Sequence, residues 1–192
     1  MTYIASAISM SLDGFVTAAG NDRAHPLGVD GERLFRWLMP PMAESDSVFL
    51  ESAIARCGAL IMGRRSYDTF EGSDTGPVGK VPVFVLTHNP PPPETVAAPD
   101  VFRFVTDGIE SAVAQASKAA GDHNVVALHG ATPVRQALRA GLVDEITVHV
   151  VPVLLGAGTR LFDHLADLRV ELERFQVIES PEVTHLRFRV VK

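Results

Sequence analysis

Short apolar runs that end in polar turns recur along the chain, and they predict a series of β-strands. The first run, Tyr3–Met10, stops at Ser11–Gly14, a sequence typical of a turn. Cys57–Met62 is a compact apolar run bounded by Gly63, as expected of a strand buried on both faces. Further strands are expected at Val81–Thr87, Val101–Val105, Val125–Leu128 and Glu145–Val153.

Between these runs, apolar residues recur at the spacing of an α-helix. In Gly31–Pro40 three of them would share one helix face, and a proline ends the segment. Thr132 and Pro133 are candidates for the N-cap and first residue of a helix that closes at Gly141. Helices are also expected at Ser47–Ala55, Arg64–Phe70 and Asp107–Ala120, with long loops at Ala18–Asp30 and Glu71–Lys80.

The last part of the chain has a different pattern. Val170–Ile178 and Val183–Val191 alternate in polarity around the turn at Glu179–Glu182, which predicts an antiparallel hairpin. Before it, strands alternate with helices. The pattern therefore indicates an α/β fold whose sheet is mostly parallel with an antiparallel C-terminal edge. In such sheets ligands bind beyond the carboxyl ends of the strands.

Composition narrows the class of protein. The chain has 192 residues, is 46% hydrophobic and carries a formal net charge of −6, which suits a globular domain and offers no basic surface for nucleic acid. A single cysteine, Cys57, excludes an internal disulfide or a zinc site built on several thiolates. The histidines lack metal-ligand spacing, so no metal is expected. No apolar run is long enough for a bilayer, and the first residues lack signal-peptide features. We expect one cytoplasmic domain over residues 1–192.

The segment Ile61–Tyr67 carries the sharpest local signal for a binding site. A buried strand runs into Gly63, and Arg64 and Arg65 then occupy the expected first turn of a helix. The helix dipole disfavours cations there by about 0.3–1 kcal/mol each. Their placement is explained if they meet an anion such as a phosphate. The alternative is that they lie in solvent or pair with Asp68 or Glu71.

Three other strand ends offer polar groups at equivalent places. Leu128–Val134 joins a strand to a helix through small residues that permit a close approach of phosphate to the backbone. Leu86–Asn89 supplies hydroxyl, imidazole and amide groups, and Ser11–Gly14 follows the first strand. Each is ordinary turn chemistry when taken alone. Together, four polar strand ends favour a phosphorylated nucleotide as ligand.

Four motifs occur in an order that resembles a known family. They are Ser11–Gly14, Met62–Tyr67, Ala140–Glu145 and Val151–Phe162. The chain is similar to the dihydrofolate-reductase-like superfamily, in the branch of the C-terminal reductase domain of the bifunctional riboflavin-biosynthesis deaminase/reductase. The resemblance runs from residue 3 to about residue 190, and the last motif is the most specific. The cysteine motif of the deaminase half does not occur, which suggests a free-standing reductase domain.

The resemblance implies a three-layer fold with a central sheet of about eight strands, a homodimer, and NADPH as cofactor. It implies that Gly63, Arg64, Arg65 and Ser66 hold the 2′-phosphate and pyrophosphate, and that Leu86, Thr87 and His88 line the adenosine site. Leu128, His129, Gly130, Ala131, Thr132 and Val134 would follow the pyrophosphate and nicotinamide ribose, with Thr159 nearby. Ser9 and Val16 would flank the nicotinamide.

Two departures from the family bear on the site. The family has two glycines where this chain has His129 and Gly130, so a side chain enters a crowded turn. The folate enzymes carry an acidic residue on their first helix, and Glu32 stands near that place here.

The resemblance implies hydride transfer from NADPH to a small heterocyclic compound, as in reduction of 5-amino-6-(5-phosphoribosylamino)uracil in riboflavin biosynthesis. A dihydrofolate or pteridine reductase and a non-catalytic NADPH-binding module are the alternatives. Hydride transfer requires a proton donor, and Asp13 is the candidate, although Asp-Gly is also a common turn dipeptide. The apolar character of both alternations in Glu145–Leu155 also suggests an interface of the homodimer.

Overall fold

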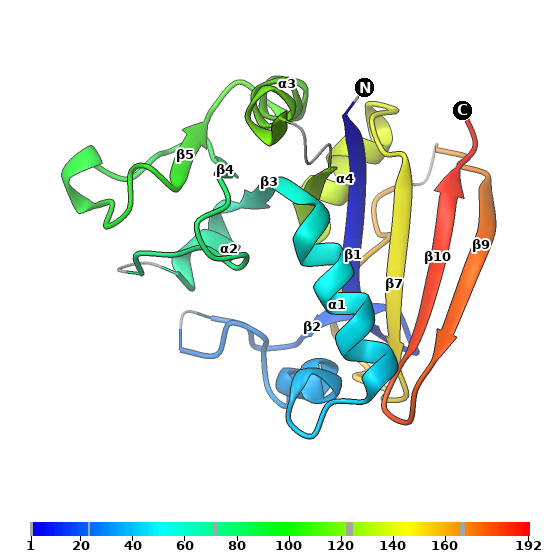
Figure 1. Cartoon of the computed structure of the whole chain (residues 1–192). Helices are drawn as coiled ribbons and strands as arrows, with labels where there is room; N and C mark the ends of the chain where they lie inside the picture. The colour runs from blue at the N-terminus through cyan, green and yellow to red at the C-terminus, as the bar shows by residue number, and fades with distance from the viewer. Residues whose placement is uncertain (1, 23, 71–72, 122–124, 166–167) are drawn as a thin grey trace.

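A computed structural model describes residues 2–22, 24–70, 73–121, 125–165 and 168–192. Its centre is an eight-stranded sheet in the order β5-β4-β3-β6-β1-β7-β10-β9 (Figure 1). The strands are β1 (Tyr3–Ser11), β3 (Cys57–Gly63), β4 (Val83–Leu86), β5 (Phe102–Val105), β6 (Val125–His129), β7 (Glu145–Val151), β9 (Leu172–Glu179) and β10 (Thr184–Val190). The pairs from β5 through β7 are parallel, and β10 is antiparallel to both β7 and β9. The expected mostly parallel sheet with an antiparallel C-terminal hairpin is confirmed.

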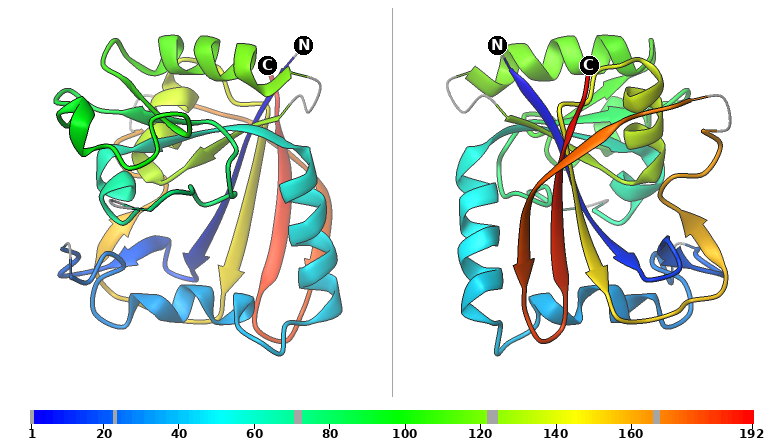
Figure 2. Two further views of the ribbon diagram at one scale, coloured as in Figure 1. Left: turned by 60° about the vertical axis from the view of Figure 1, so that its left-hand side comes forward. Right: turned by 90° about the vertical axis from the view of Figure 1, so that its right-hand side faces the viewer.

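Helices cover both faces of this sheet. They are η1 (Gly31–Leu38), α1 (Glu44–Arg56), α2 (Arg64–Asp68), η2 (Pro93–Thr95), α3 (Ile109–Ala120) and α4 (Ala131–Arg139). Figure 2 shows α1 on one side of the sheet and α3 with α4 on the other, which gives the expected three layers.

Three helix predictions need correction. The segment Gly31–Leu38 is a 3-10 helix, and α2 ends at Asp68 rather than continuing to Phe70. The helix expected behind Thr132 and Pro133 begins earlier, at Ala131, and its N-cap is Gly130. Gly130 has φ 88° and ψ 154°, a non-helical conformation that glycine adopts readily. The helix therefore begins at the next residue.

A second, two-stranded sheet was not expected from the sequence. β2 (Phe15–Ala18) pairs antiparallel with β8 (Gly158–Arg160), and Thr17 lies opposite Thr159. A Cβ on Gly158 would lie 1.9 Å from the carbonyl oxygen of Thr17, so this pairing requires glycine. The strands are too short to show an alternation in sequence.

The two faces of β1 differ in the size of their side chains. Ile4 and Ile8 point into the main core, which α3 and α4 complete. The other face carries Ala5, Ala7 and Ser9 in alternation with them. In α1, whose residues are all described, the one buried residue is Asp46. Small side chains on the strand and a helix that does not fill the space above them leave room for a cleft.

Candidate functional site

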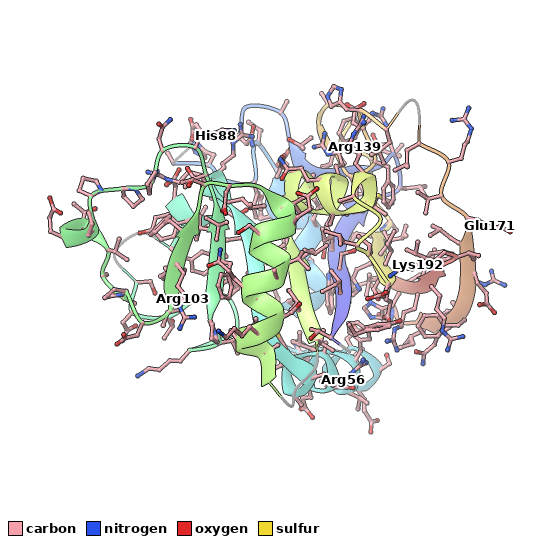
Figure 3. The ribbon with its side chains drawn as sticks, turned by 90° about the horizontal axis from the view of Figure 1, so that it is seen from above. Arg56, His88, Arg103, Arg139, Glu171 and Lys192 are labelled. Carbon is pink, nitrogen blue, oxygen red and sulfur yellow. The ribbon has the colours of Figure 1, made fainter. Side chains whose placement is uncertain are left out.

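A cleft of about 1170 Å³ lies between α1, β1 and the carboxyl ends of β3, β4 and β6. The sheet register places those strand ends together, because Gly63 of β3 is opposite Leu86 of β4 and Met62 of β3 is opposite His129 of β6. His88, just beyond β4, lies on the opposite side of the molecule from Arg56 at the end of α1 (Figure 3). Three of the four polar strand ends singled out in the sequence, those of β3, β4 and β6, therefore meet at this cleft, whereas Ser11–Gly14 is outside its lining.

Nearly all the residues expected at a cofactor site line this cleft. They are Ser9, Val16, Gly63, Arg64, Arg65, Ser66, Leu86, Thr87, His88, Leu128, His129, Gly130, Ala131, Thr132 and Thr159. Val134 is the exception, since it is fully buried in the main core beneath α4. Its position one turn into the helix turns its side chain toward the sheet and away from the cleft.

The two arginines at the start of α2 differ in their surroundings. Arg64 is half-buried, and its Nε donates to Asp68 Oδ1 at 2.7 Å while its Nη1 donates to the carbonyl of Asn89 at 2.6 Å. The pairing with Asp68 considered from the sequence is therefore present, whereas Glu71 lies outside the described residues. Arg65 is exposed, with no hydrogen bond or ion pair to another described residue. Since α2 has five residues, attraction for an anion here comes from the guanidinium groups.

The start of α4 forms the opposite side of the same corner. A Cβ on Gly130 would lie 3.3 Å from Ser66 Oγ, so the two turns are in near contact. No side chain caps the first N–H groups of α4, which leaves them available to a ligand. His129 ends β6 in an extended conformation, and the left-handed residue is Gly130. The histidine therefore adds a side chain without backbone strain, and burial lowers its pKa.

Two buried polar atoms in the cleft have no hydrogen-bond partner among the described residues. They are Thr17 Oγ1 and Asn21 Nδ2, and both residues line the cleft. Leaving such a group unsatisfied costs about 1–3 kcal/mol. A ligand with hydrogen-bonding groups would remove this cost. These orphaned atoms, the uncapped helix start and Arg65 fit a phosphorylated nucleotide cofactor.

Asp13 does not occupy the place of a proton donor. Its carboxylate accepts hydrogen bonds from Ser11 Oγ at 2.6 Å and from the backbone N–H groups of Gly156 and Leu155 at 2.7 and 3.1 Å. The bond from Ser11, followed by the two backbone bonds, lowers its pKa to about 2. A carboxylate that stays ionised and lies outside the cleft lining cannot supply a proton there. Asp13 instead ties the first turn to the loop before β8.

The other wall of the cleft is formed by residues that were not predicted from the sequence. Trp37 of η1, Phe49 of α1 and His149 of β7 line the cleft, and Trp37 Nε1 donates to Ser9 Oγ at 3.0 Å. A signal for His149 existed, because it is a polar residue between valines in a largely buried strand. Glu32 is exposed and outside the lining, so it does not take the role of the acidic residue of the folate enzymes.

The described residues contain neither a metal-binding cluster nor a membrane-spanning helix. Within those ranges, no three His, Cys, Asp or Glu side chains are grouped as a metal ion would require. In the same part of the chain, no helix combines the length and the apolar character needed to cross a bilayer.

Comparison with known proteins adds a family match. Residues 2–185 match the family model of the RibD C-terminal domain. Among the curated proteins, none matches the chain.

Several solved structures share the fold. A protein of Shewanella sp. PV-4 assigned to riboflavin biosynthesis is 23% identical, with both chains covered in full and a TM-score of 0.74. The diaminohydroxyphosphoribosylaminopyrimidine deaminase/5-amino-6-(5-phosphoribosylamino)uracil reductase of Thermotoga maritima is 12% identical, with 99% of this chain and 57% of that one covered and a TM-score of 0.65. A dihydrofolate reductase of Enterococcus faecalis, complexed with NADP(H), is 16% identical, with 99% and 97% covered and a TM-score of 0.59. At these identities the likeness establishes a dihydrofolate-reductase-like fold.

Proposed function

The chain belongs to the RibD C-terminal domain family, and on that premise we propose that it is an NADPH-dependent reductase of a small heterocyclic compound. The main support for this proposal is that Arg65, the uncapped start of α4 and the unpartnered polar atoms of Thr17 and Asn21 all line one cleft. These groups suit the phosphates and sugars of a dinucleotide. At about 1170 Å³ the cleft exceeds the 300–1,000 Å³ typical of one drug-sized ligand, which leaves room for a second small molecule.

The cofactor end of the proposed site contains the positive charges. Arg64 and Arg65 would bind the adenosine 2′-phosphate, and Gly63 with Ser66 would follow the pyrophosphate. Leu86, Thr87 and His88 would line the adenosine. Leu128, His129, Gly130, Ala131, Thr132 and Thr159 would bind the pyrophosphate and nicotinamide ribose, and Ser9 and Val16 would flank the nicotinamide. Val134 is not part of this proposal, because it lies in the core.

The substrate end is aromatic. Trp37 and Phe49 line it with apolar ring surface that would suit a planar heterocycle, and the bond from Trp37 Nε1 holds Ser9 in place. When bound, NADPH supplies the hydride. The chain orients the two reactants and excludes water from them. We propose 5-amino-6-(5-phosphoribosylamino)uracil as the substrate, which is the compound reduced by the Thermotoga maritima neighbour.

The proposal also includes the form of the protein. One sheet contains both Tyr3 and Val190, which supports residues 1–192 as a single domain. A homodimer and a cytoplasmic location are part of the same proposal. The burial of β7 does not by itself require a partner chain, because Ile146 and Val148 pack in the main core on one face and Phe49 of α1 packs on His149 on the other.

Cofactor binding is tested by calorimetric titration of the chain with NADPH and NADH. Arg65→Ala removes a charge-assisted bond to the 2′-phosphate and should weaken NADPH binding by about 1.5–3 kcal/mol, roughly 10- to 100-fold. NADH binding should stay within about twofold, since NADH lacks that phosphate. Arg56→Ala is the matched control, because this exposed arginine lies outside the cleft lining. Equal weakening of both cofactors by Arg65→Ala would refute the assignment.

Turnover is tested by following NADPH oxidation with two candidate substrates in parallel. The pyrimidine substrate should give a rate, and dihydrofolate should give little or none because Glu32 is outside the cleft. A rate with dihydrofolate alone would favour the folate alternative. NADPH binding without oxidation of any kind would favour a non-catalytic binding module.

A further inference from the structure

Three polar side chains form a continuous buried chain of hydrogen bonds beneath α1. His149 Nδ1 of β7 lies 2.7 Å from His185 Nδ1 of β10, and His185 Nε2 lies 3.0 Å from Asp46 Oδ1 of α1. All three residues are at most 4% exposed. Of the three, only His149 lines the cleft. The chain of bonds therefore begins at an interior carboxylate and ends at the ligand site.

The surroundings hold this arrangement in one geometry. Ser180 Oγ donates to the second oxygen of Asp46 at 3.0 Å. The Phe49 ring stacks on His185 with centroids 4.9 Å apart, and Trp37 packs on both imidazoles at 4.9 and 5.1 Å. Aromatic packing on both rings and a bond at each nitrogen of His185 restrict rotation of the pair. Burying polar groups is unfavourable unless each one has a hydrogen-bond partner. The burial of three such side chains in one fixed geometry therefore suggests a functional role.

The distances determine where the protons lie. A carboxylate only accepts hydrogen bonds, so His185 Nε2 carries a proton and donates it to Asp46. In a neutral His185 the Nδ1 atom is then an acceptor, and His149 Nδ1 must be the donor across the 2.7 Å contact. His149 is left with a bare Nε2. An additional proton can bind to this hydrogen-bonded series only at His149 Nε2. The negative charge of Asp46 then balances the positive charge of the imidazolium.

His149 is also adjacent to the proposed reaction centre. It is the cross-strand partner of Ser9 in the β1–β7 register, and Ser9 is the residue proposed to flank the nicotinamide. Trp37 contacts both, through its ring to His149 and through Nε1 to Ser9. The histidine, the serine and the indole thus share one wall of the cleft.

We propose that His149 is the catalytic residue that donates the proton to the substrate, with His185 and Asp46 as positioning residues that fix its tautomer. This rests on the proposed reductase function. In the step, the substrate carbon takes the hydride as its π bond to oxygen or nitrogen breaks, and that heteroatom takes the proton from His149 Nε2. NADPH is oxidised to NADP⁺, and His149 regains a proton from solvent through the open cleft.

The pH dependence follows from the charges around the pair. Burial, followed by the proximity of His185, lowers the pKa of His149. Asp46 faces the pair from α1, while Glu145 of β7 and Arg187 of β10 pair with each other at 2.7 Å. The other charged residues of α1 and of η1 are exposed. The doubly protonated form of His149, which is the proton donor, is therefore the minor form at neutral pH. The rate of reduction should rise as the pH falls from 8 toward 6.

The decisive comparison uses kinetic variants with a binding readout. His149→Gln should lower kcat by roughly 10²–10⁴-fold, the usual contribution of general acid catalysis, and should remove the rise at low pH. NADPH affinity should stay within about twofold. Asp46→Asn should lower kcat less and move the rise to lower pH, because the balancing charge is lost. His164→Asn is the matched control, since His164 is exposed with φ 57°, which asparagine tolerates, and both rate and profile should be unchanged.

A measurement without turnover guards against variants that fail to fold. Histidine ring ¹⁵N NMR of the wild-type protein should show His149 protonated at Nδ1 and His185 at Nε2. The opposite tautomers would overturn the proposal, as would full activity of His149→Gln. A wild-type protein that binds but never oxidises NADPH would instead overturn the reductase function, and the role of His149 with it. The two failures are thus distinguishable.

Discussion

Gly130 offers the sharpest test of the corner between α2 and α4. Its φ of 88° with ψ of 154° belongs to a region that is almost exclusive to glycine. Replacement by alanine forces an L-residue into that conformation at a cost of about 1–3 kcal/mol. The added Cβ would meet Ser66 Oγ at 3.3 Å, a contact that a small rotation of the serine relieves. The backbone therefore dominates the cost.

Thermal unfolding measures this cost directly. For a domain of 150–250 residues, each kcal/mol shifts Tm by about 2–4 °C, so Gly130→Ala should lower Tm by roughly 2–12 °C. If the turn binds the pyrophosphate, the new methyl group also blocks close approach to the N–H groups of α4. Loss of one bond to a charged group would then weaken NADPH binding about 10- to 100-fold.

Gly141→Ala is the matched control for this test. Gly141 follows α4 and also has a positive φ, 66°, but a Cβ there would have nothing within 4 Å. It should lower Tm and leave NADPH binding unchanged. If Gly130→Ala unfolds at the wild-type temperature, the turn does not enforce the conformation described. If it is destabilised but binds NADPH normally, the turn is not a cofactor site.

Three other predictions concern pH and assembly. The pKa of Asp13 is lowered from 3.8 to about 2, so its stabilising effect is present above pH 3.8 and lost between there and pH 2. Urea titrations at pH 7 and pH 3 measure the free energy of unfolding, and Asp13→Asn should reduce the difference in that energy between the two pH values. The pKa of His129 lies below its unfolded value of 6.5, so the unfolded chain binds more protons and stability falls below pH 6.5. His129→Gln should flatten this fall, and an unchanged slope would contradict the burial of the imidazole. Light scattering should show a dimer, and a 20.7 kDa species at micromolar concentration would contradict the homodimer.

The pattern of apolar and polar residues along the chain was sufficient to predict most of the helices and strands. The apolar runs predicted β1, β3, β4, β5, β6 and β7, because a strand buried on both faces needs continuous apolar residues whatever its partners are. The alternation in polarity predicted β9 and β10. The family motifs supplied the correct class of fold. Gly130 lay within a segment predicted as a strand-to-helix turn, and the structure confirmed the turn while moving the helix start from Pro133 to Ala131, two residues earlier.

The cleft itself depended on tertiary structure. Asp13 was the candidate proton donor because it is an acidic residue just after the first strand, but its partners Leu155 and Gly156 are more than 140 positions away. Asp46 and His185 are separated by 139 positions, and no local pattern links them. Sequence periodicity reports which side of an element is apolar, since that depends on near neighbours. Strand order and register decide which polar residues then meet, and these are set by packing across the whole chain.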